Sequence, residues 1–221
     1  AYSATLLAVE GVSAPLSPAT DELLRTARDA FDRTNDRWGH ALTLFVEMEL
    51  HFAAHDLEQG RETFHAALAR FRDLRDHWGI SAVQYHYAIA MHRVGMLTEA
   101  MQAYRSALAE GRIGLTNTVQ YALANLGHLS LAVGDLDGAA AYFSSAPATA
   151  RDLGDDTSVL AAIGQGHLAR LRGETVEAAV HYQAALRQIV ETETPDWAAT
   201  AHIGIGHIAL EQGDSDAAQH R

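Results

Sequence analysis

An internal repeat with a period of about 40 residues constrains the fold of this chain more than any other feature. Gly95, Gly134, Gly173 and Gly213 form one column in steps of about 39–40 positions, and His55 occupies the same column one step earlier. A glycine at a fixed place in each copy suits a residue in the left-handed conformation at the end of a helix. Self-similarity at this period is typical of helical solenoids, in which each unit packs only against its neighbours.

Further columns keep the same register and indicate how two helices pack within each copy. Small residues at matched places let two helices approach closely, and an aromatic side chain fills the space beside them. In most copies a small residue lies seven positions before the first column, alanines lie five and twelve positions after it, and an aromatic lies nine positions after it. The clearest members are Gly127, Gly166 and Gly206; Ala100, Ala139, Ala178 and Ala218; Phe64, Tyr104, Phe143 and Tyr182; and Ala67, Ala107, Ala146 and Ala185.

The residues between the columns predict helices and their ends. Apolar residues recur at helical spacing, and the alternation of a half-buried strand is missing. Asp56, Asp135 and Asp214 directly follow the first column, where an aspartate can accept hydrogen bonds from the free amides of the next helix. The prolines, which we expect near helix ends, are Pro15, Pro18, Pro147 and Pro195. The sequence therefore predicts an all-α chain of repeated helix–turn–helix pairs.

Composition excludes several classes of function. The 221 residues contain no cysteine and no lysine, so disulfides, thiolate nucleophiles, Schiff-base lysines and a P-loop lysine are all excluded. A formal charge of −12 argues against a nucleic-acid surface, which needs a basic stripe. No apolar run reaches the roughly 18 residues that a membrane span requires, so we expect a cytoplasmic location.

One copy carries the columns especially clearly, in Gly127, Gly134, Ala139, Phe143 and Ala146, and this pattern resembles the tetratricopeptide repeat. The resemblance implies a right-handed superhelical solenoid of about five and a half helix pairs in one domain, residues 1–221. The repeat lacks the usual tryptophan and closing proline, and it is longer than the usual length of about 34 residues. We expect a fragment of a longer protein, with units at about 1–40, 41–80, 81–119, 120–158, 159–198 and 199–221.

A narrower likeness lies in the joints between helices. The segments 35–39 and 75–79 read Asn-Asp-Arg-Trp-Gly and Arg-Asp-His-Trp-Gly and precede a helix, and residues 131–137 read Leu-Ala-Val-Gly-Asp-Leu-Asp. These joint sequences are similar to those in the repeat region of large bacterial ATP-dependent transcriptional regulators of the MalT-like, LuxR-type and antibiotic-regulator classes. The resemblance implies a module that senses an inducer or partner, with the NTPase and DNA-binding domains elsewhere in the polypeptide.

The tetratricopeptide resemblance also implies a binding groove. In such superhelices the first helix of each unit lines the concave face, and a protein, a peptide or a small inducer is the expected partner. Transferred to this sequence, the groove comprises Phe45, Glu49, Tyr85, His86, Ile89, His92, Tyr121, Asn125, His128, His167, Arg170 and His207.

Three of the groove residues form a ladder, because His128, His167 and His207 share one position in successive units. They either contact a ligand or lie half-buried with hydrogen bonds to a neighbouring helix. Neighbouring helices are about 8–10 Å apart, and zinc needs nitrogens within about 2.1 Å of one point, so we expect no metal site. No other cofactor is expected.

The sequence gives no reason to expect an enzyme. Gly164, Gly166 and Ala169 match a dinucleotide-binding pattern, but this pattern needs a strand-to-helix turn and here it falls inside a predicted helix. Packing glycines explain it better. Two hypotheses remain: an interaction and sensing module, or a structural scaffold that pairs with another copy of itself as a homodimer.

Overall fold

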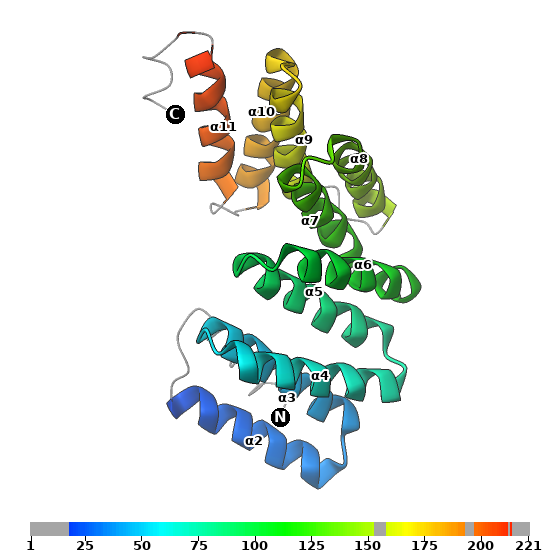
Figure 1. The fold of residues 1–221 in the computed structure, drawn as a ribbon. Coiled ribbons are helices and arrows are strands. Elements are labelled where there is room, and N and C mark those ends of the chain that lie inside the picture. Colours follow the sequence, from blue (N-terminus) through cyan, green and yellow to red (C-terminus); the bar gives the residue numbers. More distant parts are fainter. Residues whose placement is uncertain (1–17, 153–157, 193–196, 212, 214–221) are drawn as a thin grey trace. The chain divides into compact units, whose positions relative to one another are not determined.

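We analysed a computed structural model, which describes residues 18–152, 158–192, 197–211 and 213. Within these ranges the regular elements are α-helices, as the repeat predicts (Figure 1). They are α2 (Pro18–Thr34), α3 (Arg37–Ala53), α4 (Leu57–Leu74), α5 (His77–Arg93), α6 (Leu97–Gly114), α7 (Thr118–Ala132), α8 (Leu136–Asp152), α9 (Val159–Leu171), α10 (Thr175–Thr192) and α11 (Ala198–Glu211).

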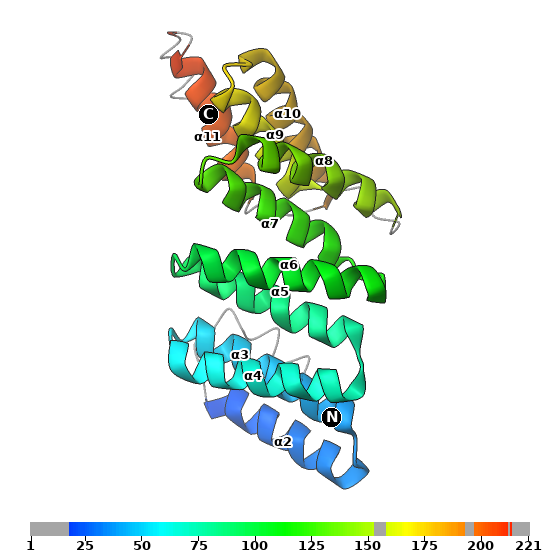
Figure 2. The same ribbon diagram turned by 45° about the vertical axis from the view of Figure 1, so that its right-hand side comes forward.

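The chain divides into two compact units, Ala1–Thr116 and Asn117–Arg221. In the first unit α3 pairs with α4 and α5 with α6, and α2 packs against α3 (Figure 2). In the second unit α7 pairs with α8 and α9 with α10, and α11 packs against α10 and α9. Each unit is thus built from consecutive helix pairs, and within a unit each pair packs against the next one along the chain.

The turn inside each pair contains the left-handed residue that the first column predicts. The φ angles are +79° at Gly95, +81° at Gly134, +78° at Gly173 and +80° at Gly213, and His55 has a φ of +61°. Glycine adopts this conformation without the steric cost that a Cβ atom brings. The column of glycines therefore marks the places where the chain reverses direction.

An aspartate caps the N-terminus of each helix of the α3–α4 pair. Asp56 accepts a hydrogen bond from the backbone amide of Gln59, at 3.1 Å, and Asp36 accepts one from Gly39, at 2.9 Å. The predicted cap at Asp135 is also present, whereas Asp214 lies outside the described residues. The helix after Asp36 begins at Arg37, so Trp38 and Gly39 belong to the first turn of α3 and do not precede it.

Helix pairs begin slightly earlier than the unit boundaries expected from the sequence. The joints between pairs in the first unit lie at residues 35–36 and 75–76, where Asn35 and Arg75 have φ angles of +52° and +54°. The expected boundaries at 40 and 80 therefore fall inside the first turns of α3 and α5.

Two rings of the aromatic column, Phe143 and Tyr182, are buried between glycines, in agreement with the close helix packing that the sequence predicts. The Phe143 ring is fully buried, and a Cβ atom added at Gly127 would lie 2.5 Å from its Cε1 atom. A Cβ atom at Gly164, on the first helix of the next pair, would lie 2.1 Å from the same atom. Tyr182 is enclosed in the same way one repeat later. Each ring therefore joins its own helix pair to the next one.

Pro147 departs from the expectation that prolines lie near helix ends, because it lies inside α8. A proline at this position cannot donate a hydrogen bond to the carbonyl of Phe143, four residues earlier. The side-chain amide of Gln165 donates to that oxygen, at 3.4 Å, and so supplies a substitute donor from α9. Pro18 is the first residue of α2, where proline is favoured, and Pro15 and Pro195 lie outside the described residues.

We expect the Gln165→Ala substitution to lower the free energy of unfolding by about 1 kcal/mol, because the Phe143 carbonyl loses its donor. In a Pro147→Ala background the alanine amide supplies the helical hydrogen bond, so the same substitution should cost clearly less. Urea unfolding of the four proteins measures this coupling. Gln183→Ala, at an exposed position of α10, is the control. An equal loss in both backgrounds would contradict the substitute-donor role.

Candidate functional site

Four of the predicted groove residues come together in the first unit, and we call Phe45, Glu49, Tyr85 and His86 the α3–α5 cluster. Phe45 and Glu49 are one turn apart on α3, and Tyr85 and His86 are adjacent on α5. The Phe45 and His86 rings meet edge-to-face with centroids 5.0 Å apart. The Glu49 carboxylate lies 3.1 Å from Nδ1 of His86. The cluster thus links the first helices of two successive pairs.

The α3–α5 cluster packs on α6 on one side and is accessible to solvent on the other. The Tyr85 ring packs against the buried Tyr104 ring of α6, with centroids 5.7 Å apart. All four cluster side chains are half-buried. They present aromatic surface beside a carboxylate and an imidazole, a combination that suits a peptide segment with apolar and polar side chains.

Two other predicted residues extend along α5. Ile89 lies one turn beyond Tyr85, and His92 follows at the end of the helix; both side chains are half-buried. Burial lowers the pKa of His92, because the surrounding protein disfavours the charged imidazolium.

In the second unit, the histidine ladder takes part in contacts between helices. Nε2 of His128 is 3.1 Å from the backbone oxygen of Leu160 on α9, and Nδ1 of His167 is 2.8 Å from the Tyr182 hydroxyl on α10. The two imidazole rings lie edge-to-face with centroids 6.1 Å apart. Each of these half-buried side chains therefore uses one ring nitrogen within the unit.

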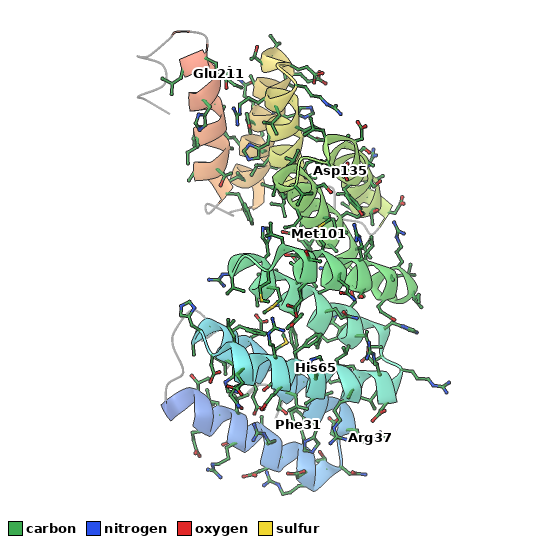
Figure 3. The ribbon with its side chains drawn as sticks, in the orientation of Figure 1. Phe31, Arg37, His65, Met101, Asp135 and Glu211 are labelled. Atoms are coloured by element: carbon green, nitrogen blue, oxygen red, sulfur yellow. The ribbon has the colours of Figure 1, made fainter. Side chains whose placement is uncertain are left out.

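Of the remaining predicted residues of the second unit, Tyr121 and His207 are exposed, whereas Asn125 and Arg170 are half-buried. His207 lies on α11. Arg170 forms a 3.0 Å ion pair with Glu211, the residue labelled near the end of α11 in Figure 3, and this pair joins α9 to α11. Tyr121 is 41% exposed, and the Asn125 side-chain amide donates to its backbone oxygen at 2.9 Å. The amide of Asn125 is therefore partly used within α7.

Three observations concern metal ions, membranes and nucleotides in the described part of the chain. No group of three or more histidine, aspartate or glutamate side chains in the described ranges lies close enough to hold a metal ion. None of the described helices is long and apolar enough to cross a bilayer. Gly164 and Gly166 lie inside α9 against aromatic rings, which confirms that they are packing glycines and not a nucleotide-binding turn.

Sequence reasoning missed two links between successive pairs in the first unit. The Trp38 indole donates a hydrogen bond to Asp76, which also caps α5. Arg61 binds both oxygens of Glu99, at 2.9 and 2.8 Å. The recurrence of Asp-x-Trp-Gly in two successive copies signals the first link. The second has no sequence signal, because two residues 38 positions apart on different helices match no motif.

Tyr104 and Tyr182 occupy the same column but differ in their hydrogen bonding. The Tyr182 hydroxyl bonds to His167, whereas the buried Tyr104 hydroxyl has no hydrogen-bond partner among the residues that the structure describes. In the repeat that contains Tyr104, the position equivalent to His167 is occupied by Ile89, which cannot form this hydrogen bond. Burial raises the pKa of both tyrosine hydroxyls. An unsatisfied buried hydroxyl costs free energy that a phenyl ring would not.

We therefore expect one substitution to have opposite effects in two repeats. Tyr104→Phe should raise the free energy of unfolding by about 1 kcal/mol, and Tyr182→Phe should lower it by about 1 kcal/mol. Urea unfolding of the two variants measures the difference, and each serves as the control for the other. The Ile89→His substitution should remove most of the gain from Tyr104→Phe. Equal effects of the two tyrosine substitutions would contradict this account.

Stability should depend on pH through His167. Burial, together with the charges of Arg170 and His207, lowers its pKa in the folded state from the ordinary 6.5. Below pH 6.5 the unfolded chain takes up a proton that the folded chain resists, so stability should fall as the pH decreases, by at most about 1.4 kcal/mol per pH unit for this group. We expect His167→Asn to reduce the loss measured by urea unfolding between pH 7.5 and 5.5. His55→Asn, at an exposed turn, should leave the loss unchanged.

No protein-family model matches the chain, and no curated protein matches its sequence. Solved structures do match it. BtubC (BKLC) from P. vanneervenii aligns with a TM-score of 0.71 and 18% identity over 99% of this chain and 87% of that chain. PilF of Pseudomonas aeruginosa aligns with a TM-score of 0.69 and 17% identity over 99% of this chain and 86% of that chain.

Two structures of assemblies are similar as well. The Cut9–Hcn1 hetero-tetramer of the APC/C contains a chain that aligns with a TM-score of 0.66 and 19% identity over 88% of this chain. This chain spans 34% of the length of that relative. A Rap protein complexed with competence and sporulation factor aligns with a TM-score of 0.63 and 15% identity over 97% of this chain and 66% of that chain. Together these likenesses confirm the predicted fold, which is an all-helical solenoid of tetratricopeptide-like pairs.

Proposed function

We propose that the chain is an interaction module that binds a protein or peptide on the α3–α5 cluster, and that it is not an enzyme. One observation supports this proposal above the others. Phe45, Glu49, Tyr85 and His86 contact one another across two successive helix pairs and still remain accessible to solvent. A surface that is pre-arranged in this way loses little side-chain entropy when a partner binds.

The similar structures support a binding role. A Rap protein was solved with competence and sporulation factor bound, and Cut9 was solved in an assembly with Hcn1. The histidine ladder adds less support, because His128 and His167 already bond within their unit.

We further propose that the chain is the sensory repeat region of a larger cytoplasmic transcriptional regulator from bacteria. The support is the resemblance of the Asp-x-Trp-Gly joints at residues 36–39 and 76–79 to those regulators. A complete reading frame that encodes an NTPase and a DNA-binding domain would support this placement. A complete frame without either domain would contradict it.

A small inducer is the alternative occupant of the α3–α5 cluster. Identifying the bound partner distinguishes a small inducer from a protein or peptide.

The binding surface can be tested by site-specific photo-crosslinking in a native lysate. We would place p-benzoylphenylalanine at Phe45 and, as a matched control, at Arg105, an exposed position of α6 outside the cluster. We expect a distinct partner to be captured from position 45 and not from position 105, because only the first lies in the cluster.

The affinity of the captured partner then provides the quantitative test. Phe45→Ala/His86→Ala should weaken binding by at least tenfold, and Arg105→Ala should leave it unchanged. Capture from position 105 alone, or unchanged affinity of the double variant, would exclude the cluster as the binding surface. Capture of a second copy of this chain from position 45 would favour the scaffold hypothesis.

A further inference from the structure

The first unit contains a cavity of about 460 Å³ between α2, α3 and α4. The α3 side chains that line it are Arg37, His40, Thr43, Leu44 and Glu47, whose spacing places them on one face of the helix. At 3.6 residues per turn, Phe45 and Glu49 of the α3–α5 cluster lie about half a turn around the same helix. The cavity is therefore separate from that cluster, and a ligand in the cavity is independent of any partner that binds the cluster.

Both acidic groups of the cavity are already paired with basic ones. Arg28 of α2 forms an ion pair with Glu47. Nε2 of His40 lies 2.9 Å from the carboxylate of Asp32. These contacts occupy the two carboxylates, so they offer little attraction to a cationic ligand.

Two further arginines line the same cavity. Arg37 lies at the start of α3, beside the turn from α2 (Figure 3), and Arg70 lies near the end of α4. Neither forms an ion pair or a hydrogen bond with a side chain among the described residues, and both are exposed. The cavity therefore has an excess of positive charge, although the chain as a whole carries a formal charge of −12.

We propose that this cavity binds a small organic anion through Arg37 and Arg70. A guanidinium group donates paired hydrogen bonds to a phosphate or a carboxylate, so two of them can hold one such group. Leu44 and Leu74 provide apolar surface in the cavity, against which a compact apolar part of the same ligand can pack. The volume lies within the range of about 300–1,000 Å³ that is usual for small-molecule sites.

The cavity one repeat later shows that this chemistry is not a general consequence of the fold. It has a volume of about 310 Å³, and Gln84 and Tyr87 replace Leu44 and Glu47 in its wall. Its carboxylate, Glu99, is bound by Arg61, and Arg72 is the sole arginine that lines it. Of these two cavities, only the first is lined by two arginines that have no side-chain partner among the described residues.

The test is calorimetric titration of the intact chain at constant ionic strength. The probes are phenyl phosphate, benzoate, inorganic phosphate and the neutral benzyl alcohol. We expect one of the two aromatic anions to bind at least tenfold more tightly than inorganic phosphate, and benzyl alcohol not to bind. Which anion binds tells whether the site takes a phosphate or a carboxylate.

Matched variants locate the site. Arg37→Gln/Arg70→Gln should weaken anion binding by at least tenfold, because it removes both positive charges. Arg37→Lys/Arg70→Lys should weaken binding less, because lysine keeps the charge and loses only the paired hydrogen bonds of the guanidinium group. Arg105→Gln/Arg112→Gln removes the same charge from exposed positions of α6 and should bind as the unaltered chain does. Circular dichroism checks that each variant is folded. The proposal is overturned if no probe binds, if the first variant keeps its affinity, or if the α6 variant loses it equally.

Discussion

Close contact between aromatic rings and glycines is the constraint on which the rest of the structure depends. The ring of Phe143 lies against Gly127 of its own pair and Gly164 of the next, with no room for a Cβ atom at either place. Because a ring of fixed size lies between three helices, it sets both their spacing and their rotation. That rotation decides which side chains of each first helix are buried and which remain available to a ligand.

The sequence predicts those parts of the fold that only a few residue types can supply. A left-handed turn favours glycine, as at Gly134, and a close helix contact requires it, as at Gly127, so both recur as columns. The sequence pattern predicts a helix end near Pro147, but the proline lies inside α8. The helix tolerates it because Gln165 of α9 donates the missing hydrogen bond, and no local sequence pattern indicates that donor.

The candidate site was less predictable, because exposed positions are not fixed by packing. The tetratricopeptide resemblance implies that Phe45 and His86 share one face of successive helices, and these two side chains do meet. It cannot tell that His167 bonds to Tyr182, whereas the equivalent Ile89 leaves the Tyr104 hydroxyl without a hydrogen bond in the described part of the chain. Such differences arise from pairs of residues 15 positions apart that vary independently between copies.

Function can arise in a repeated fold at the positions that packing leaves free. Packing restricts the buried columns to a few residue types, so two copies differ in chemistry mainly at the positions between the columns. Leu44 and Glu47 of α3 correspond to Gln84 and Tyr87 of α5, and the cavities beside them differ accordingly. The opposite face of α3, with Phe45 and Glu49, varies just as freely. The single helix α3 therefore presents two surfaces of different chemistry, one toward the cavity and one toward α5.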